Sequence, residues 1–198
     1  MEKGFICIST LDRFEELRKF LISFHKFNFL PIIALIARDM ADAHRIKTLC
    51  AFYTPFKYSA LLDTDILVNG DLSDMFYPAL ENRIGIVREK EAKCLNSGVI
   101  VFPLEKMKII CTEWNRKYEH RIKKGFEGKS GTWDQCILND LLINLPIVEL
   151  SSIYNHILKD YTPEQELELY DSVKLFHFLH APDIDRNKYK SYQTFMSL

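Results

Sequence analysis

The sequence has almost no net charge, because 26 Lys and Arg residues are set against 27 Asp and Glu residues over 198 positions. A protein that binds nucleic acid through the phosphate backbone usually carries a basic excess. We therefore expect no nucleic-acid partner. Local basic clusters, such as Arg121, Lys123 and Lys124, are expected to be solvated surface.

The chain also has no apolar run approaching the roughly 18 residues that identify a membrane span, and no signal-peptide cleavage site near its start. Its five cysteines are odd in number and scattered through apolar stretches, without the CxxC spacing of a metal site. Reduced core thiols in a cytoplasmic protein are expected. Peripheral contact with a membrane stays open.

Short apolar runs alternate with helix-periodic segments along the first part of the chain. Residues 5–8, 31–37 and 58–63 are predicted to be buried strands, and apolar spacing predicts helices over 14–24 and 46–53. Ser9 or Thr10 is expected to cap the first helix. Strands and helices in alternation imply parallel strands joined by crossover helices, so an α/β fold is predicted.

The second half of the chain continues with both kinds of element. Strands are predicted at 83–88, 99–103, 147–150 and 173–180, and helices at 107–124, ended by Gly125, and at 133–142. Thr162 and Gln165 frame a capping box at the start of a further helix. Residues 126–132 are expected to form a surface loop. The chain is expected to be one domain over 1–198, with 183–198 as a loosely packed tail.

Two acids stand one residue apart where the third strand ends. Asp63 and Asp65 follow a buried apolar run, and apolar residues resume directly after them. Carboxylates beside a buried strand are costly unless something pairs with them, and a turn lets both point at one ion. Mg²⁺ or Mn²⁺, bound partly through substrate phosphate oxygens, fits such a pair.

Four blocks of the sequence, in order, resemble nucleotide-sugar glycosyltransferases with the GT-A fold, and in particular glycosyltransferase family 8, the glycogenin-like and bacterial galactosyltransferase group. Residues 59–76 resemble the Leu-Asp-x-Asp region, and residues 95–100 (LNSGVI) resemble a Phe-Asn-Ser-Gly-Val block. Residues 133–135 (WDQ), with Asn139, resemble an Asp-Gln helix start. Residues 173–178 (VKLFHF) resemble a C-terminal strand that contains a His.

The resemblance implies a single Rossmann-like GT-A domain with a mixed, mostly parallel central sheet flanked by helices. It implies an enzyme that moves a sugar, a hexose by expectation, from a nucleoside-diphosphate sugar to an acceptor hydroxyl with retention of configuration. A UDP-sugar is the favoured donor, and a glycan, a lipid-linked sugar or a protein is the acceptor. Asp63, Asp65 and His177 would hold the metal, and two carboxylates with one imidazole favour Mn²⁺ over Mg²⁺.

Further roles are implied for polar residues around this centre. Asp134 and Gln135 are expected to act catalytically beside the sugar ring. Thr10 and Asp39 leave the first two strands, where α/β sheets place the base and ribose. Arg45 or Lys47 is expected to reach the diphosphate, and the sequence does not choose between them. The donor-binding set expected from the sequence comprises Thr10, Asp39, Arg45, Lys47, Asp63, Thr64, Asp65, Asn96 and Ser97.

The chain departs from the family after His177, where HAPD at 180–183 replaces a Gly followed by Lys-Pro-Trp, and Lys188 or Lys190 comes late. A degenerate sugar-nucleotide-binding module without turnover is therefore one alternative. A haloacid-dehalogenase-like phosphatase that uses Asp63 and Asp65 is another. In that family, however, the motif usually closes the first strand, whereas here two strand–helix units precede it.

Overall fold

The computed structural model describes residues 2–90, 94–124, 133–178 and 185–198. Its centre is a six-stranded sheet in the order β2-β1-β3-β6-β5-β7. β1 pairs in parallel with β2 and β3, and β5 with β7, whereas β6 runs antiparallel to both its neighbours. The mixed, mostly parallel sheet expected from the sequence is confirmed. The strands are β1 (Lys3–Thr10), β2 (Ile32–Ala37), β3 (Tyr58–Asp63), β5 (Ile84–Arg88), β6 (Leu95–Pro103) and β7 (Ile147–Glu149).

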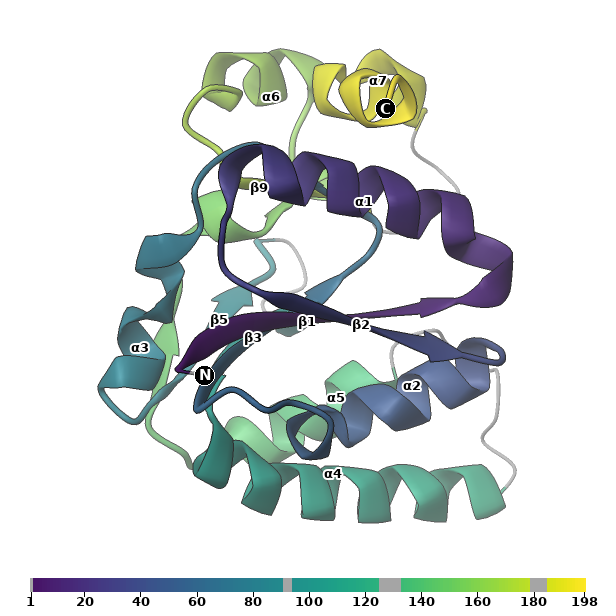
Figure 1. The fold of residues 1–198 in the computed structure, drawn as a ribbon, viewed down its shortest axis with the longest axis vertical. Helices are drawn as coiled ribbons and strands as arrows, with labels where there is room; N and C mark the ends of the chain where they lie inside the picture. Colours follow the sequence, from purple (N-terminus) through teal and green to yellow (C-terminus); the bar gives the residue numbers. More distant parts are fainter. Residues whose placement is uncertain (1, 91–93, 125–132, 179–184) are drawn as a thin grey trace.

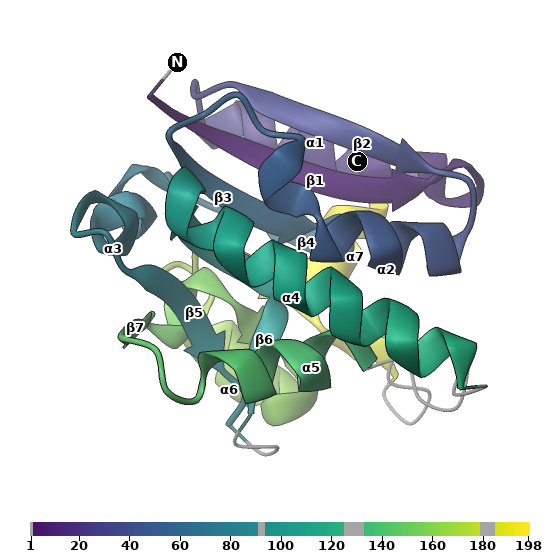
Figure 2. The same cartoon turned by 90° about the horizontal axis from the view of Figure 1, so that it is seen from below.

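Helices cover both faces of this sheet (Figures 1 and 2). On one face α1 (Phe14–Phe27) and α3 (Tyr77–Leu80) close a core that contains Phe5, Phe24 and Phe76. On the other face α2 (Met40–Thr48), α4 (Leu104–Lys123) and α5 (Trp133–Leu142) close a second core around Trp114. Burying apolar side chains on both faces explains why the strands are continuous apolar runs.

A second, three-stranded sheet lies beside the first, in the order β4-β9-β8. It carries its own core, to which α7 contributes the buried Phe195. Residues 189–198, part of the segment expected to pack loosely, therefore pack against α1, α6 and β4. The elements of this region are β4 (Ile66–Val68), β8 (His156–Ile157), α6 (Pro163–Leu169), β9 (Leu175–His177) and α7 (Lys190–Met196).

Two of the expected helix starts, those of α1 and α2, differ from the starts in the structure, and a third is confirmed. The capping box of Thr162 and Gln165 is confirmed at α6, but neither Ser9 nor Thr10 caps α1. The 3₁₀ turn Leu11–Arg13 intervenes, and the N-cap of α1 is Arg13, without a side-chain hydrogen bond. α2 starts well before residue 46 because the Asp39 carboxylate accepts the N–H of Asp42.

Some expectations fall outside the described residues: the helix end at Gly125, the loop at 126–132 and the end of the last strand at 179–180. The remaining 3₁₀ turns are Cys50–Phe52, Ser73–Phe76, Ser152–Tyr154, Leu158–Asp160 and Arg186–Lys188. Within the described part of the chain, no helix combines the length and apolarity needed to cross a bilayer.

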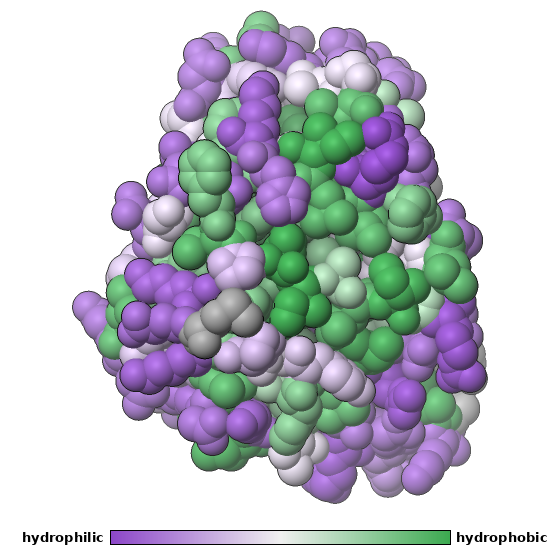
Figure 3. All heavy atoms as spheres, in the orientation of Figure 1, coloured by the Kyte–Doolittle hydropathy of each residue, from purple (hydrophilic) through white to green (hydrophobic). Residues whose placement is uncertain are grey.

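Apolar side chains also gather on one outer face of the molecule, the face seen in Figure 3. The edge strand β2 carries six apolar residues and no charge, and Ile36 is 45% exposed. Phe29, just before this strand, is 98% exposed. Neither Phe29 nor Ile36 lines the cavity described next, which is lined by residues at the ends of β1 and β3 and at the start of β6.

Candidate active site

The chain passes from one sheet to the other at Thr64 and Asp65. β3 ends at Asp63 in the large sheet, and β4 begins at Ile66 in the small one, where it pairs with β9. In that pairing Ile66 lies opposite His177, and the N–H of Phe178 donates to the carbonyl oxygen of Asp65. A strand pairing across more than a hundred residues therefore brings the two acids and the histidine together.

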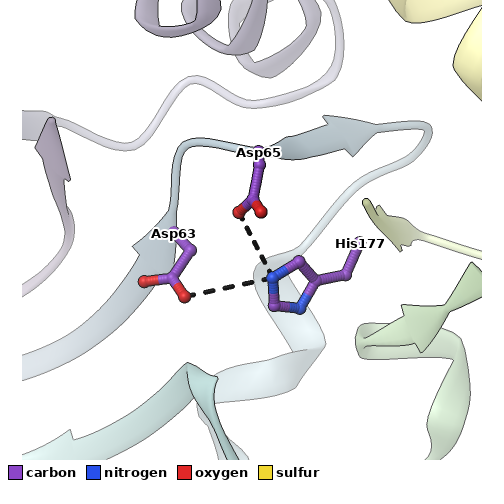
Figure 4. A group of neighbouring side chains, drawn as sticks. All are labelled: Asp63, Asp65 and His177. Carbon is purple, nitrogen blue, oxygen red and sulfur yellow. Dashed lines mark ion pairs between the residues drawn. The ribbon is translucent and has the colours of Figure 1, made fainter. Parts of the chain in front are cut away.

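The three side chains point at a common position (Figure 4). Nε2 of His177 lies 3.2 Å from Oδ1 of Asp65 and 3.9 Å from Oδ2 of Asp63. One ligand atom from each residue lies within 4.8 Å of the other two. This grouping can hold a metal ion.

The donor and acceptor pattern tests whether a cation fits. Nδ1 of His177 lies 2.9 Å from Oδ1 of Asn155, so Nδ1 is the donor when that oxygen accepts. The buried Nε2 has no hydrogen bond of acceptable geometry among the described residues. When neutral, Nε2 is then an acceptor facing two further acceptors, which favours a cation between them.

The backbone at Gly98 leaves the space that this cation needs. A Cβ atom at this position would overlap Cε1 of His177 and lie 2.9 Å from Oδ2 of Asp63. Heavy atoms do not approach so closely without displacement, so a glycine is required here because of space. The residues present therefore fit a divalent cation.

The surroundings of Asp65 and His177 favour the ionised forms of both side chains. Burial raises the pKa of Asp65, but the charge of His177 close by outweighs it and brings that pKa to about 2. Burial lowers the pKa of His177, yet the carboxylates of Asp65 and Asp63 hold it above its ordinary value. A cation bound between these side chains would therefore compete with a proton on Nε2.

Lys47, and not Arg45, is the basic residue that reaches the acids. Its Nζ lies 2.9 Å from Oδ1 of Asp63 and 3.6 Å from Oδ2 of Asp134. Burial lowers the pKa of Lys47, but the charges of Asp63 and Asp134 outweigh this and raise it. Arg45 is half exposed and pairs with Asp42. The structure thereby separates two candidates that the sequence left open.

An irregularity in β6 shapes the neighbouring wall. The sequence predicted a strand only over 99–103, but Asn96, Ser97 and Gly98 also lie within β6. β5 residues 86 and 87 pair with 100 and 96, so residues 97–99 bulge between consecutive partners. A bulge re-aims side chains and leaves ladder groups unpaired.

Helix α5 satisfies the groups that the bulge frees. Gln135 accepts the N–H of Ser97 at 3.0 Å, and Asn139 both accepts from and donates to the backbone of Leu95 at 2.8 Å. The Ser97 hydroxyl donates to Asp134 at 3.2 Å. Gln135 and Asn139 are four residues apart on one helix face, which explains why this spacing occurs at the start of α5.

These groups line a cavity of about 810 Å³. Thr10 and Thr64 line it as well, and Oγ1 of Thr10 is buried without a hydrogen bond in the described structure. Two of the described candidates do not line the cavity. Asp39 caps α2, and Arg45 forms an ion pair on the surface. The candidates that line the cavity are Thr10, Lys47, Asp63, Thr64, Asp65, Asn96, Ser97, Asp134 and Gln135.

Sequence reasoning missed three polar residues of this region. Glu89 is 3% exposed and accepts from Asn96, Gln135 and Lys159 at 2.8, 2.8 and 2.7 Å. Asn155 contacts His177. Glu89 directly follows a predicted strand, and the carboxyl ends of parallel strands hold ligands, so it could have been found. No pattern in the sequence distinguished Lys159 or Asn155.

Comparison with known proteins rests on structure alone, because neither a family model nor a curated protein sequence matches this chain. The glycosyltransferase GlyE of Streptococcus pneumoniae TIGR4 superposes with a TM-score of 0.73 at 18% identity, over 100% of this chain and 61% of GlyE. The galactosyltransferase LgtC, solved with donor and acceptor sugar analogues, gives 0.73 at 13% identity, over 98% and 94%. WbbM, a bifunctional glycosyltransferase, gives 0.74 at 12% identity, over 99% and 49%.

The fold is therefore that of the GT-A glycosyltransferases, as the four sequence blocks predicted. At these identities the likeness establishes the fold and not the activity. The chain spans about three-fifths of the length of GlyE and about half that of WbbM. What it transfers, and to what, is accordingly a proposal.

Proposed function

We propose that this protein transfers a sugar from a nucleoside-diphosphate sugar to an acceptor hydroxyl, with a divalent metal at Asp63, Asp65 and His177. The observation that carries the proposal is the convergence of these three ligand atoms on one position, with an otherwise unexplained acceptor at Nε2 of His177. A bound divalent cation would supply charge neutralisation of the leaving diphosphate. Manganese, a UDP-sugar donor and retention of configuration are part of the proposal.

The protein groups divide this work between them. Lys47 adds a fixed positive charge beside the acids, which favours a diphosphate at this end of the cavity. Thr10 offers an unpaired hydroxyl at the exit of β1, where a ribose or base would bind. Glycosyl transfer breaks the C1–O bond to the diphosphate while the acceptor oxygen bonds to C1, and the acceptor proton leaves with the departing phosphate or with water.

The sugar would lie against the bulge of β6 and the start of α5. The carboxylate of Asp134 and the amide of Gln135 face this part of the cavity. Asp134 offers an anion for sugar hydroxyls and for the positive charge that develops at C1. Oε1 of Gln135 is held by the N–H of Ser97, so it keeps a constant direction. We propose that these two residues act on the sugar.

The test measures ligand binding and turnover in one protein. Thermal shift and calorimetry with UDP, GDP and a panel of their sugars are expected to show binding that needs Mn²⁺ or Mg²⁺. Asp65→Asn should remove the metal-dependent part, whereas Asp71→Asn should not. Asp71 is an exposed acid a few residues along, whose carboxylate accepts from Ser73. A complete lack of metal-dependent nucleotide binding contradicts the proposal.

The same protein distinguishes the alternatives. A phosphatase would release phosphate from an aryl phosphate and lose this activity in Asp63→Asn; the proposal expects no such release. A binding module would take up nucleotide and metal without releasing UDP from the sugar, even slowly to water. Metal-dependent UDP release, increased by an acceptor, supports transfer.

A further inference from the structure

A continuous hydrogen-bonded chain of side chains runs behind the candidate metal site. It begins at Lys159, whose Nζ donates to Oε2 of Glu89 at 2.7 Å. Oε1 of Glu89 accepts from Nδ2 of Asn96 at 2.8 Å, and Oδ1 of Asn96 accepts from Nδ2 of Asn155 at 2.9 Å. Oδ1 of Asn155 then lies 2.9 Å from Nδ1 of His177.

Every link in this chain has a direction, because an amide has a donor end and an acceptor end. An ionised Glu89 can only accept, so Asn96 must turn its NH₂ group toward it. Oδ1 of Asn96 then faces Asn155, which must donate to it with its own NH₂ group. Oδ1 of Asn155 is left for His177, and an oxygen without a hydrogen requires Nδ1 to be the donor.

A second group imposes the same direction independently. The backbone N–H of Gly98 donates to Oδ1 of Asn96 at 2.9 Å, and a backbone N–H cannot accept. Turning the amide of Asn96 around would place its NH₂ group against this N–H. Three members of the hydrogen-bonded chain are deeply buried: Asn96, Asn155 and His177 are at most 2% exposed. Water therefore has little access to replace a wrongly directed bond.

We infer that Glu89 is a positioning residue which, acting through Asn96 and Asn155, keeps the proton of His177 on Nδ1 and leaves Nε2 as a bare ligand atom. A histidine binds a metal through the nitrogen without a proton, and the hydrogen bond at the other nitrogen selects it. This inference rests on the proposed metal site and extends it to Glu89 and Asn155, which lie in none of the sequence motifs.

Glu89 also holds the catalytic candidate Gln135. Nε2 of Gln135 donates to the same Oε1 that Asn96 contacts, at 2.8 Å. This bond directs Oε1 of Gln135 toward the N–H of Ser97. One carboxylate therefore orients both the histidine of the metal site and the amide beside the sugar position, and Lys159 balances its charge.

The first test is the protonation of His177 in the metal-free wild-type protein, read by ¹⁵N NMR of the ring above the pH at which the ring becomes neutral. The inference expects the proton on Nδ1 and a bare Nε2. A neutral ring with its proton on Nε2 overturns it. This reading needs neither a variant nor activity, and Nε2 would otherwise favour keeping its proton beside Asp65.

The second test removes the fixed hydrogen-bond direction at residue 89 and leaves the shape of the side chain unchanged. Glu89→Gln can donate as well as accept, so the constraint that Glu89 imposes is lost and only the N–H of Gly98 still favours the original direction. Mn²⁺ binding, measured by EPR on the folded protein, should weaken about tenfold or more, the usual range for a group behind a metal ligand. Glu149→Gln is the matched control, since Glu149 is an exposed acid that pairs with Arg88 on the neighbouring strand.

The outcomes separate this inference from the proposed function. Equal Mn²⁺ affinity in Glu89→Gln and wild type contradicts the positioning role while the metal site stands. Wild-type protein that binds no Mn²⁺ contradicts the proposed function itself. Should Glu89→Gln not fold, the wild-type ring spectrum still decides whether Nδ1 carries the proton.

Discussion

Two charged parts of the candidate site, the binding end (Asp63, Asp65 and His177) and the support end (Glu89 and Lys159), handle burial in opposite ways. At the end of Asp63, Asp65 and His177, acceptor atoms face one another, and Lys47 is the described lysine that pairs with Asp63. At the end of Glu89, Oε1 accepts from Asn96 and Gln135, and Oε2 accepts from Lys159. A satisfied buried network stiffens a structure, whereas an unsatisfied one is costly unless a ligand completes it. The first end is thus suited to binding, and the second to support.

Removing a ligand atom from the binding end is expected to have the largest effect. Asp65→Asn takes away one of two negative charges and should lower kcat/KM about a thousandfold, because metal-ion stabilisation contributes several kcal/mol. Steady-state UDP release with saturating Mn²⁺ measures this. Activity within tenfold of wild type would mean that Asp65 does not hold the metal.

Filling the space between the ligands is the next largest change. In Gly98→Ala the new Cβ would meet the ring of His177 and the carboxylate of Asp63. Mn²⁺ binding is expected to weaken about a hundredfold, at the upper end of what disturbing a ligand's surroundings costs. Calorimetric titration with Mn²⁺ measures it. Gly70→Ala is the control, because there the new methyl group meets the flexible side chain of Lys174; an equal loss in both variants would indicate general damage.

Breaking the support end should instead lower stability. Lys159→Met leaves the buried carboxylate of Glu89 without its charged partner and should lower the free energy of unfolding by about 1–3 kcal/mol. Urea denaturation measures this change. Lys108→Met removes an exposed lysine of similar geometry, 2.9 Å from Glu105, and should change stability by less than about 0.5 kcal/mol. Equal losses in the two variants would contradict a special role for Lys159.

The smallest expected effect is a pH dependence at the support end. Burial raises the pKa of Glu89, but hydrogen bonds from Lys159, Asn96 and Gln135 outweigh it and hold the pKa below its ordinary 4.5. A lowered pKa means that the ionised form stabilises the fold, fully above about pH 4.5 and less as pH falls through the folded value. Urea unfolding from pH 3 to 6 should show a shallower pH slope in Glu89→Gln. Identical slopes would show that Glu89 does not contribute.

Much of the fold was predictable because it depends on local patterns. Buried strands in a mostly parallel sheet appear as apolar runs, and helices as periodic ones. Thr162 and Gln165 were correctly predicted to cap α6, since a capping box lies within four residues. The N-cap of the first helix was predicted wrongly, because the turn Leu11–Arg13 separates Thr10 from α1. That turn has no strong signal of its own.

The candidate site was predictable where its residues belong to a recognisable sequence motif. Asp63 and Asp65 follow a buried strand, and Gln135 lies at a helix start, so all three could be proposed as candidates from the sequence. The choice of Lys47 over Arg45 required knowing which side of α2 faces the sheet. The role of Glu89 required knowing that the bulge of β6 turns Asn96 toward it.

The sequence by itself determined the elements, the α/β class and the residues with metal-binding chemistry, because these follow from spacing and side-chain type. Only the tertiary structure decided which groups meet. The pairing of β4 with β9 places His177 beside Asp65. The hydrogen bonds through Asn96 and Asn155 orient the ring of His177. Both depend on contacts between residues far apart in the chain, and hydrogen-bond direction is a property of the assembled network rather than of any single residue.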